Sequence, residues 1–191
     1  MKNDIQQTID TLVGGGIVIF PTDTAFGIGC RIDDEKAVQR LFKIRKRAET
    51  KPAPVLVSST AMAEKWVDIP SQKVRSLMKN YWPGGLTIIL NSKNTRVSKL
   101  VKGGGNTLGV RMPDHADLLQ IIEKIGVPII GSSANFAGES TPYLYNDLSQ
   151  ELIQLVDFVL PGNTRGGTKA STVIDCTKEP FTILREGAVK L

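Results

Sequence analysis

The stretch GGGIVIFPTDTAFG, residues 14–27, is the part of the chain that best indicates its fold class. Three glycines lead into residues 17–20, an apolar run rich in β-branched and aromatic side chains that is typical of a buried strand. Thr22, Asp23 and Thr24 follow directly. Open α/β sheets usually place ligands just beyond such strand ends. Taken alone, the motif favours a simple Asx-type turn without a ligand.

Short apolar runs and helical patterns alternate along the rest of the chain. Helical spacing predicts an N-terminal helix and helices near 34–47, 60–67, 71–81, 115–125 and 147–156, with Asp34 as an N-cap. Strands are predicted at 17–20, 55–57, 86–90, 127–130, 158–160, 172–174 and 181–184. We therefore expect an α/β fold with one domain over residues 1–191, in which helices flank a twisted open sheet. Consecutive strands near the end leave little room for crossover helices, so the sheet should be mixed.

Composition limits the class of protein. The chain has 191 residues, of which 41% are hydrophobic, enough for one sizeable core. No apolar run approaches the length of a membrane span, and the N-terminal apolar residues keep helical spacing unlike a signal peptide. Cys30 and Cys176 lack the spacing of metal ligands. We expect reduced core thiols, no metal site and a cytoplasmic location.

The charge balance favours an anionic partner. With 24 lysines and arginines against 19 acidic residues, the formal net charge is +5. Nucleotide, pyrophosphate and RNA would all fit, and so would a basic protein with no such partner. Lys43, Arg45, Lys46 and Arg47 cluster at the end of a predicted helix. Cations there suit the helix dipole in any case, although several on one loop also suit a triphosphate.

Three further segments carry polar or basic groups at predicted strand ends. The sequence GSSAN at 131–135 follows an apolar strand, and its polar groups need either a ligand or a turn to satisfy them. The glycines of GGGNT at 103–107 could approach phosphate, although such a run is more often a loop without a ligand. Arg111, at the end of a short strand, is flanked by apolar residues, which favours a fixed anionic partner over a solvated side chain.

Several familiar catalytic patterns are absent. Residues 162–169 have Walker A glycine spacing, but the lysine is one position late and a strand follows. No G-x-G-x-x-G is present. The single histidine, His115, has no evident catalytic partner and is predicted to face solvent in a turn. An enzyme built from these residues would act by positioning and charge neutralisation, as in displacement at phosphorus.

Six motifs follow one another along the chain: PTDT at 21–24, RKR at 45–47, WPGGLT at 82–87, VRMP at 110–113, SAN at 133–135, and STV at 171–173 with LR at 184–185. Taken together and in this order, they resemble the YrdC/TsaC family of threonylcarbamoyl-AMP synthases, in its single-domain form. The family usually has lysine where this chain has Arg45, which implies that Arg45→Lys should be nearly silent.

The resemblance implies a nucleotidyltransferase with a YrdC-like fold. Such an enzyme joins L-threonine and bicarbonate into a carbamate, which attacks ATP, carried with Mg²⁺, and releases pyrophosphate. The product then passes to a separate tRNA-modifying transferase complex. The implied threonine-binding residues are Thr22, Thr24, Phe26, Arg111, Gly131 and Ser171. The implied ATP-binding residues are Arg45, Arg47, Lys51, Thr107, Ser133, Asn135, Ser140 and Arg185. No residue is assigned a catalytic role beyond positioning.

Two other functions remain open at this point. The basic charge would also suit a double-stranded RNA-binding or ribosome-assembly module. Only 6% of the residues are aromatic, so base stacking is poorly supported and any RNA binding should be weak. A carbamoyl-transfer domain like those of hydrogenase-maturation proteins is the third reading, although the acylphosphatase and zinc-finger-like segments of those proteins are missing. Threonine-dependent pyrophosphate release separates the three.

Overall fold

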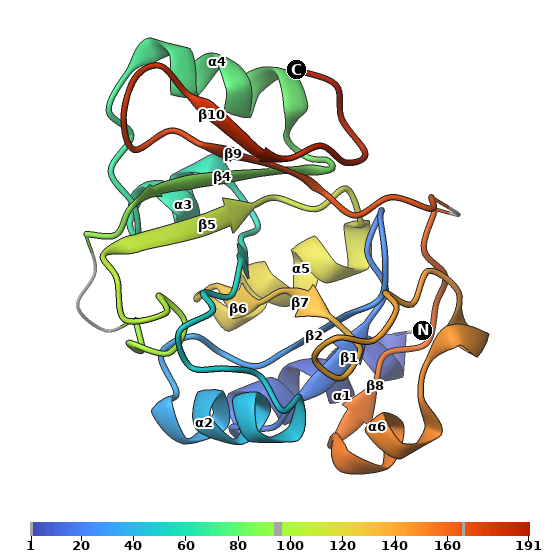
Figure 1. Cartoon of the computed structure of the whole chain (residues 1–191). Coiled ribbons are helices and arrows are strands. Elements are labelled where there is room, and N and C mark those ends of the chain that lie inside the picture. The colour runs from blue at the N-terminus through green and yellow to red at the C-terminus, as the bar shows by residue number, and fades with distance from the viewer. Residues whose placement is uncertain (1, 94–96, 166) are drawn as a thin grey trace.

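The structure, a computed structural model, describes residues 2–93, 97–165 and 167–191 (Figure 1). Its helices are α1 (Lys2–Val13), α2 (Glu35–Ile44), α3 (Thr60–Glu64), α4 (Gln72–Tyr81), α5 (Ala116–Ile125) and α6 (Gln150–Leu155), with a 3-10 turn at Tyr145–Asp147. Its strands are β1 (Val18–Phe20), β2 (Gly27–Gly29), β3 (Val55–Leu56), β4 (Leu86–Asn91), β5 (Thr107–Arg111), β6 (Ile129–Ile130), β7 (Ser132–Ser133), β8 (Phe158–Val159), β9 (Thr172–Asp175) and β10 (Thr182–Arg185). The expected α/β class with flanking helices is confirmed.

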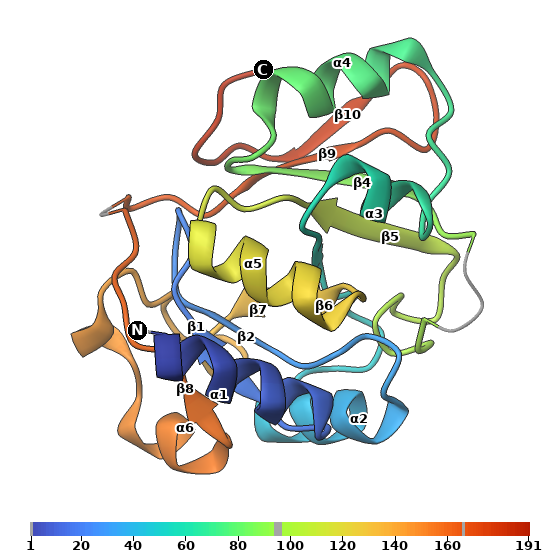
Figure 2. The ribbon, with the colours of Figure 1, turned by 180° about the vertical axis from the view of Figure 1, so that it is seen from behind.

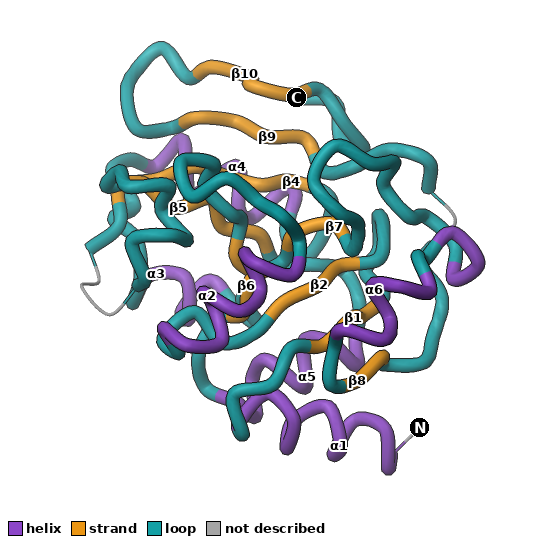
Figure 3. Tube along the Cα trace, turned by 60° about the horizontal axis from the view of Figure 1, so that its bottom comes forward, coloured by secondary structure: helices purple, strands orange, loops and turns teal. Residues whose placement is uncertain are grey.

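The strands divide between two sheets, where the sequence led us to expect one. The larger sheet has the order β10-β9-β4-β5-β3-β6, and the smaller has β7-β2-β1-β8. Figure 3 shows β10, β9 and β4 side by side at one edge of the larger sheet. Both sheets combine parallel and antiparallel pairs, for example β4 with β9 and β4 with β5. The prediction of mixed pairing is therefore confirmed.

The sheets meet where the chain passes from β6 to β7 at Gly131. On one side of this point, Ile130 N donates to Cys30 O at 2.9 Å, beside the end of β2. On the other side, Ala134 N donates to Phe26 O at 2.9 Å, beside the start of β2. One extended segment therefore follows β2 along its length while changing sheets.

Glycine is required at this crossing. Gly131 N donates to Pro54 O at 2.9 Å, which draws the crossing segment against β3. A Cβ atom at Gly131 would lie 2.4 Å from Leu56 Cγ, closer than packed carbon atoms approach. The bare backbone thus lets two sheets come together and leaves polar loops from both around one junction.

Helices α1, α3, α4 and α5 cover the same face of the two sheets, as Figure 2 shows. Helices α2 and α6 lie by the smaller sheet, at the end of the molecule away from α4 (Figure 1).

Local signals explain several helix ends. Asp34 caps α2 by accepting from Ala37 N at 3.0 Å, as predicted, and Gly126 ends α5 in the left-handed conformation. None of the helices among the described residues is long and apolar enough to span a bilayer.

The core fills the space between the helices and the sheets. Ile17, Val18, Ile19 and Phe20 are fully buried, as their predicted strand requires. Both cysteines are buried free thiols, in agreement with the prediction of core positions. Burial raises the pKa of Cys176 to about 12 and raises that of Cys30 further. Neither thiol is poised to react as a thiolate.

Candidate functional site

A cavity of about 170 Å³ lies at the junction of the two sheets. Loops and strand ends from both sheets form its wall, together with the end of α2. The lining residues are Thr22, Thr24, Ala25, Phe26, Gly27, Arg47, Pro54, Leu56, Thr87, Arg111, Gly131, Ser132, Ser133, Thr141, Ala170, Ser171 and Arg185. The wall is rich in hydroxyls, and its only charged side chains among the described residues are three arginines.

The loop after β1 is held by a threonine rather than by the aspartate of an Asx turn. Thr22 Oγ1 donates to Ala25 O at 2.7 Å and accepts from Thr24 N and Ala25 N at 3.1 and 3.2 Å. Thr22 Oγ1 also lies 3.2 Å from Thr24 Oγ1. The turn therefore needs no help from Asp23, whose carboxylate is directed elsewhere.

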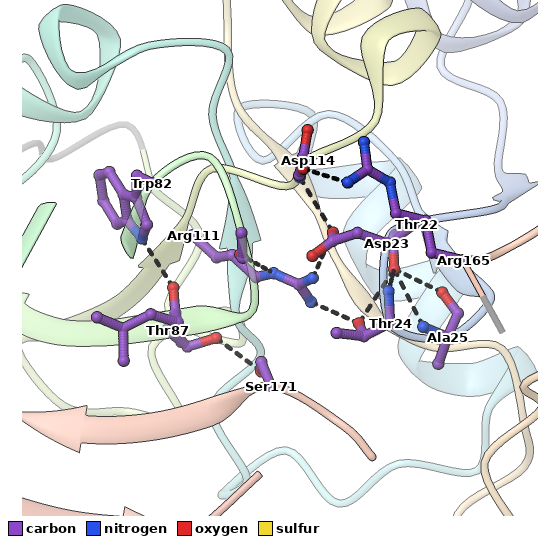
Figure 4. Close-up of polar contacts among 12 residues, drawn as sticks. Thr22, Asp23, Thr24, Ala25, Trp82, Thr87, Arg111, Asp114, Arg165 and Ser171 are labelled. Atoms are coloured by element: carbon purple, nitrogen blue, oxygen red, sulfur yellow. Dashed lines mark hydrogen bonds and ion pairs between the residues drawn. The ribbon is translucent and has the colours of Figure 1, made fainter. Parts of the chain in front are cut away.

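Arg111, which lines the cavity, pairs with Asp23, which does not (Figure 4). Arg111 Nη2 donates to Asp23 Oδ1 at 2.6 Å, and Arg111 Nη1 donates to Thr24 Oγ1 at 2.9 Å. Arg111 Nε donates to Gly84 O at 2.9 Å, within the loop that precedes β4. Burial lowers the pKa of Arg111, and the nearby Asp23 carboxylate opposes that shift. The sequence predicted that Arg111 has a fixed anionic partner. Within the protein that partner is Asp23, which sequence reasoning did not identify.

A second series of hydrogen bonds runs through Ser171. Its Oγ lies 2.9 Å from Thr87 Oγ1 on β4 (Figure 4) and accepts from Arg185 Nη2 at 3.1 Å. Arg185 Nε also donates to Ser171 O at 3.0 Å. Thr87 was not among the predicted site residues, although it lies in the WPGGLT motif. Its place in a strand gave no sign that its side chain would face a cavity.

The end of α2 brings Arg47 to the cavity. Lys46 has a left-handed φ of 51°, and Arg47 N donates to Phe42 O at 3.0 Å, which closes the helix with a Schellman-type turn. Arg47 then donates from Nε to Lys51 O at 3.2 Å and from Nη2 to Pro52 O. These bonds hold its guanidinium at the cavity wall.

Ser133 and Asn135 form a second link to α2. Ser133 Oγ donates to Asn135 Oδ1 at 2.6 Å, and Arg45 Nη2 donates to the same oxygen at 3.1 Å. Arg45 is only 4% exposed, and burial, followed by the charge of Arg47, lowers its pKa to about 10. The basic cluster is therefore split, because Arg47 reaches the cavity while Arg45 is buried behind it.

Most of the predicted site residues come together at this cavity. Those that line it are Thr22, Thr24, Phe26, Arg47, Arg111, Gly131, Ser133, Ser171 and Arg185. Five predicted ATP-binding residues do not line it: Arg45, Lys51, Thr107, Asn135 and Ser140. Thr107 begins β5, at the other end of that strand from Arg111, and Lys51 and Ser140 are exposed. The roles given to all these residues stay predictions.

Two observations concern titratable side chains outside the cavity. His115 was predicted to face solvent in a turn, and this is wrong: the residue is half-buried and caps α5, where Nδ1 accepts from Leu118 N at 3.4 Å. Burial lowers its pKa. In the part of the chain that the structure describes, no three His, Cys, Asp or Glu side chains gather as metal ligands.

The fold and the cavity define a small α/β protein with a polar, arginine-lined ligand site. The family model Sua5_yciO_yrdC, described as telomere recombination, matches residues 10–187. The chain is 31% identical over 185 residues to a threonylcarbamoyl-AMP synthase of Bacillus subtilis, an alignment that covers 97% of this chain and 54% of that protein. It is 28% identical over 189 residues to a threonylcarbamoyl-AMP synthase of Vibrio vulnificus, covering 98% and 100%.

Solved structures agree with these matches. Sua5 of Pyrococcus abyssi, complexed with L-threonine, superposes with a TM-score of 0.87 and 32% identity over 96% of this chain and 54% of that one. YciO of Escherichia coli superposes with a TM-score of 0.87 and 25% identity over 100% and 92%. This chain belongs to the Sua5/YciO/YrdC family. It spans about half the length of the Bacillus and Pyrococcus relatives.

Proposed function

We propose that this protein is a threonylcarbamoyl-AMP synthase. L-Threonine and bicarbonate would condense to a carbamate with loss of water. A carbamate oxygen would then attack the α-phosphorus of ATP, forming threonylcarbamoyl-AMP as the bond to pyrophosphate breaks. The names of the Bacillus and Vibrio relatives support this reaction, as does the Pyrococcus relative solved with L-threonine.

One observation carries the proposal. The charged side chains that line the cavity, among the described residues, are Arg47, Arg111 and Arg185, and no carboxylate, histidine, cysteine or lysine lines it. Such a wall offers no general base with a pKa near neutrality, so its hydroxyls have no group there to activate them as nucleophiles. It does offer fixed positive charge and hydroxyls. This suits a reaction in which the substrates themselves supply the nucleophile, and the protein positions them and neutralises phosphate charge.

Each substrate has plausible contacts in this wall. Arg111 would bind the threonine carboxylate with the donors that its protein contacts leave free, and Thr24 and Ser171 would contact the rest of the amino acid. Arg47 and Arg185 would neutralise the phosphates of ATP. Among the described residues the lining has hydroxyls but no carboxylate, so it fits Mg²⁺ that enters with the nucleotide and keeps its water ligands. That ion would neutralise phosphate charge alongside the arginines.

The test is a pyrophosphate-release assay with purified protein. We expect release from ATP only when both L-threonine and bicarbonate are present, and slower release with serine, because losing one methyl in a fitted subsite costs about 1–3 kcal/mol. Release that proceeds equally well without threonine would refute the proposal. If the proposal holds, the product would feed a separate tRNA-modifying transferase complex, and the protein would act in the cytoplasm.

The RNA-binding alternative makes a different prediction for the same protein. A net charge of +5 offers phosphate contacts but little base recognition, so RNA binding should be weak and should fall steeply with salt. Tight binding to one RNA at physiological salt, without pyrophosphate release, would favour that alternative instead.

A further inference from the structure

Arg45 makes its contacts inside the protein, although it belongs to the basic cluster that ends α2. Its Nε donates to the backbone oxygen of Asn135 at 3.0 Å, and its Nη2 donates to Asn135 Oδ1 at 3.1 Å. The backbone returns the contact, because Ala137 N donates to Arg45 O at 2.9 Å. Lys46 Nζ lies 4.8 Å from the centre of the Phe136 ring. The end of α2 is therefore joined to the turn after β7 at four points.

Arg45 is poorly placed to touch a ligand in the cavity. The residue does not line the cavity, and its remaining terminal nitrogen, Nη1, is enclosed by protein without a hydrogen-bond partner among the described residues. The forked guanidinium matters here, because one planar group bonds two oxygens of the same residue. A lysine ammonium carries its three donors on one nitrogen and cannot reproduce that planar geometry.

These bonds determine how Ser133 presents its hydroxyl. Asn135 Nδ2 donates to Glu139 O at 2.6 Å, so the amide nitrogen faces Glu139 and Oδ1 faces Arg45. Ser133 Oγ donates its proton to this same Oδ1 at 2.6 Å. The hydroxyl proton is thus committed within the protein, and only the lone pairs of Ser133 Oγ remain for a ligand in the cavity.

We propose that Arg45 is a positioning residue that acts through Asn135. It holds the Asn135 side chain so that Ser133 can only accept a hydrogen bond from the ligand, which in ATP means from a ribose hydroxyl or the adenine amino group. Arg47 alone of the two arginines then faces the phosphates. This inference rests on the proposed function for the identity of the ligand, ATP. It also alters the expectation for Arg45→Lys, which should weaken binding because the fork is lost.

A double-mutant cycle on ATP binding tests the inference. Calorimetry would compare the wild type with Arg45→Lys, Asn135→Ala and the double variant, without threonine. We expect each single variant to bind ATP about tenfold more weakly and the double variant to bind no more weakly than Asn135→Ala, because residues that act as one unit are not additive. Arg47→Lys is the matched control. Arg47→Lys should weaken ATP binding by the same factor whether residue 135 is Asn or Ala.

Additive losses for Arg45→Lys and Asn135→Ala would mean that Arg45 contacts ATP itself, and would overturn the inference. So would an Arg45→Lys variant that binds ATP like the wild type. If Arg45→Lys does not fold, Arg45→Met in the same cycle takes its place, since it keeps much of the side-chain volume without the donors.

Amide hydrogen exchange gives a readout that does not depend on the ligand. In Arg45→Lys the amide of Ala137, which bonds to Arg45 O, should exchange faster as the turn loosens, whereas in Arg47→Lys it should exchange at the wild-type rate. Unchanged exchange at Ala137 in Arg45→Lys would overturn the inference. A wild-type protein that binds no ATP would instead refute the proposed function, and the exchange result would still decide the role of Arg45.

Discussion

Arg111 Nη2 lies 2.6 Å from Asp23 Oδ1, and their side chains are 8% and 9% exposed. Together with its bonds to Thr24 and Gly84, Arg111 uses three of its donors inside the protein. A guanidinium has five, so two have no partner among the described residues and are left for a ligand. The ion pair thus fixes the direction in which the free donors point while cancelling much of the local charge.

We predict that Asp23→Ala destabilises the protein by about 3–5 kcal/mol, because it leaves the buried Arg111 guanidinium without its counter-charge. Urea unfolding of the wild type and the variant would measure this. Glu179→Ala is the matched control, since Glu179 pairs with Lys73 at side-chain exposures of 53% and 70%. It should cost less than about 1 kcal/mol. Equal losses in the two variants would show that the Asp23–Arg111 pair behaves as a surface contact.

Much of the fold and part of the site could be predicted because their signals are local. The apolar run at residues 17–20 and the Asp34 cap each act within one turn or one strand, and both are found. Arg111 was singled out correctly because an arginine between apolar residues rarely lacks a partner.

The remaining features depend on contacts between distant segments. Asp23 and Arg111 are 88 residues apart, and nothing in the PTDT motif shows which way its carboxylate points. Strand β2 has the sequence Gly-Ile-Gly, whose glycines disfavour a strand locally, and it forms because β1 and β7 bond to it on both sides. The division into two sheets likewise depends on Gly131 passing beside Leu56, a contact between distant segments.

Of the three arginines that line the cavity, Arg111 and Arg47 should bind different anions. We predict that Arg111→Lys weakens threonine-dependent turnover about tenfold or more at limiting threonine, while ATP binding is retained. The reason is that lysine cannot make the hydrogen bonds of the planar guanidinium. Arg47→Lys should instead weaken ATP binding. Pyrophosphate release at varied threonine, beside calorimetric ATP titration, measures both effects. If Arg111→Lys keeps wild-type turnover at limiting threonine, Arg111 does not bind the threonine carboxylate.

A third prediction concerns stability in acid. Asp157 bonds to Arg40 and to Ile17 N, and the hydrogen bond from Arg40 holds the pKa of Asp157 below its usual range. A carboxyl whose folded pKa is depressed adds stability above its unfolded pKa, about 3.9, and that stability is lost as pH falls through the folded pKa. Asp157→Asn should therefore lose less stability than the wild type between about pH 7 and pH 3.

Urea unfolding at several pH values measures this difference. Arg40→Met is the partner control, because it removes the group mainly responsible for the low pKa of Asp157. In Arg40→Met the free energy of unfolding should fall less steeply with decreasing pH, as in Asp157→Asn. If the free energy of unfolding falls equally steeply with decreasing pH in the wild type and in Asp157→Asn, the pair does not contribute to the pH dependence of stability.

The last prediction separates stability from binding at Ser132. Its hydroxyl is buried and has no hydrogen-bond partner among the described residues, yet Ser132 lines the cavity. Ser92 Oγ is a second buried hydroxyl without such a partner, and Ser92 does not line the cavity. An unsatisfied buried hydroxyl costs about 1–3 kcal/mol, so replacing either serine with alanine should stabilise the free protein. Only Ser132→Ala should also weaken substrate binding, because a ligand in the cavity would be the natural partner of that hydroxyl.

Thermal unfolding with and without ATP and threonine tests both parts. The ligand-induced rise in Tm should shrink in Ser132→Ala and stay at the wild-type value in Ser92→Ala. Equal rises in both variants would show that Ser132 makes no contact with the substrates.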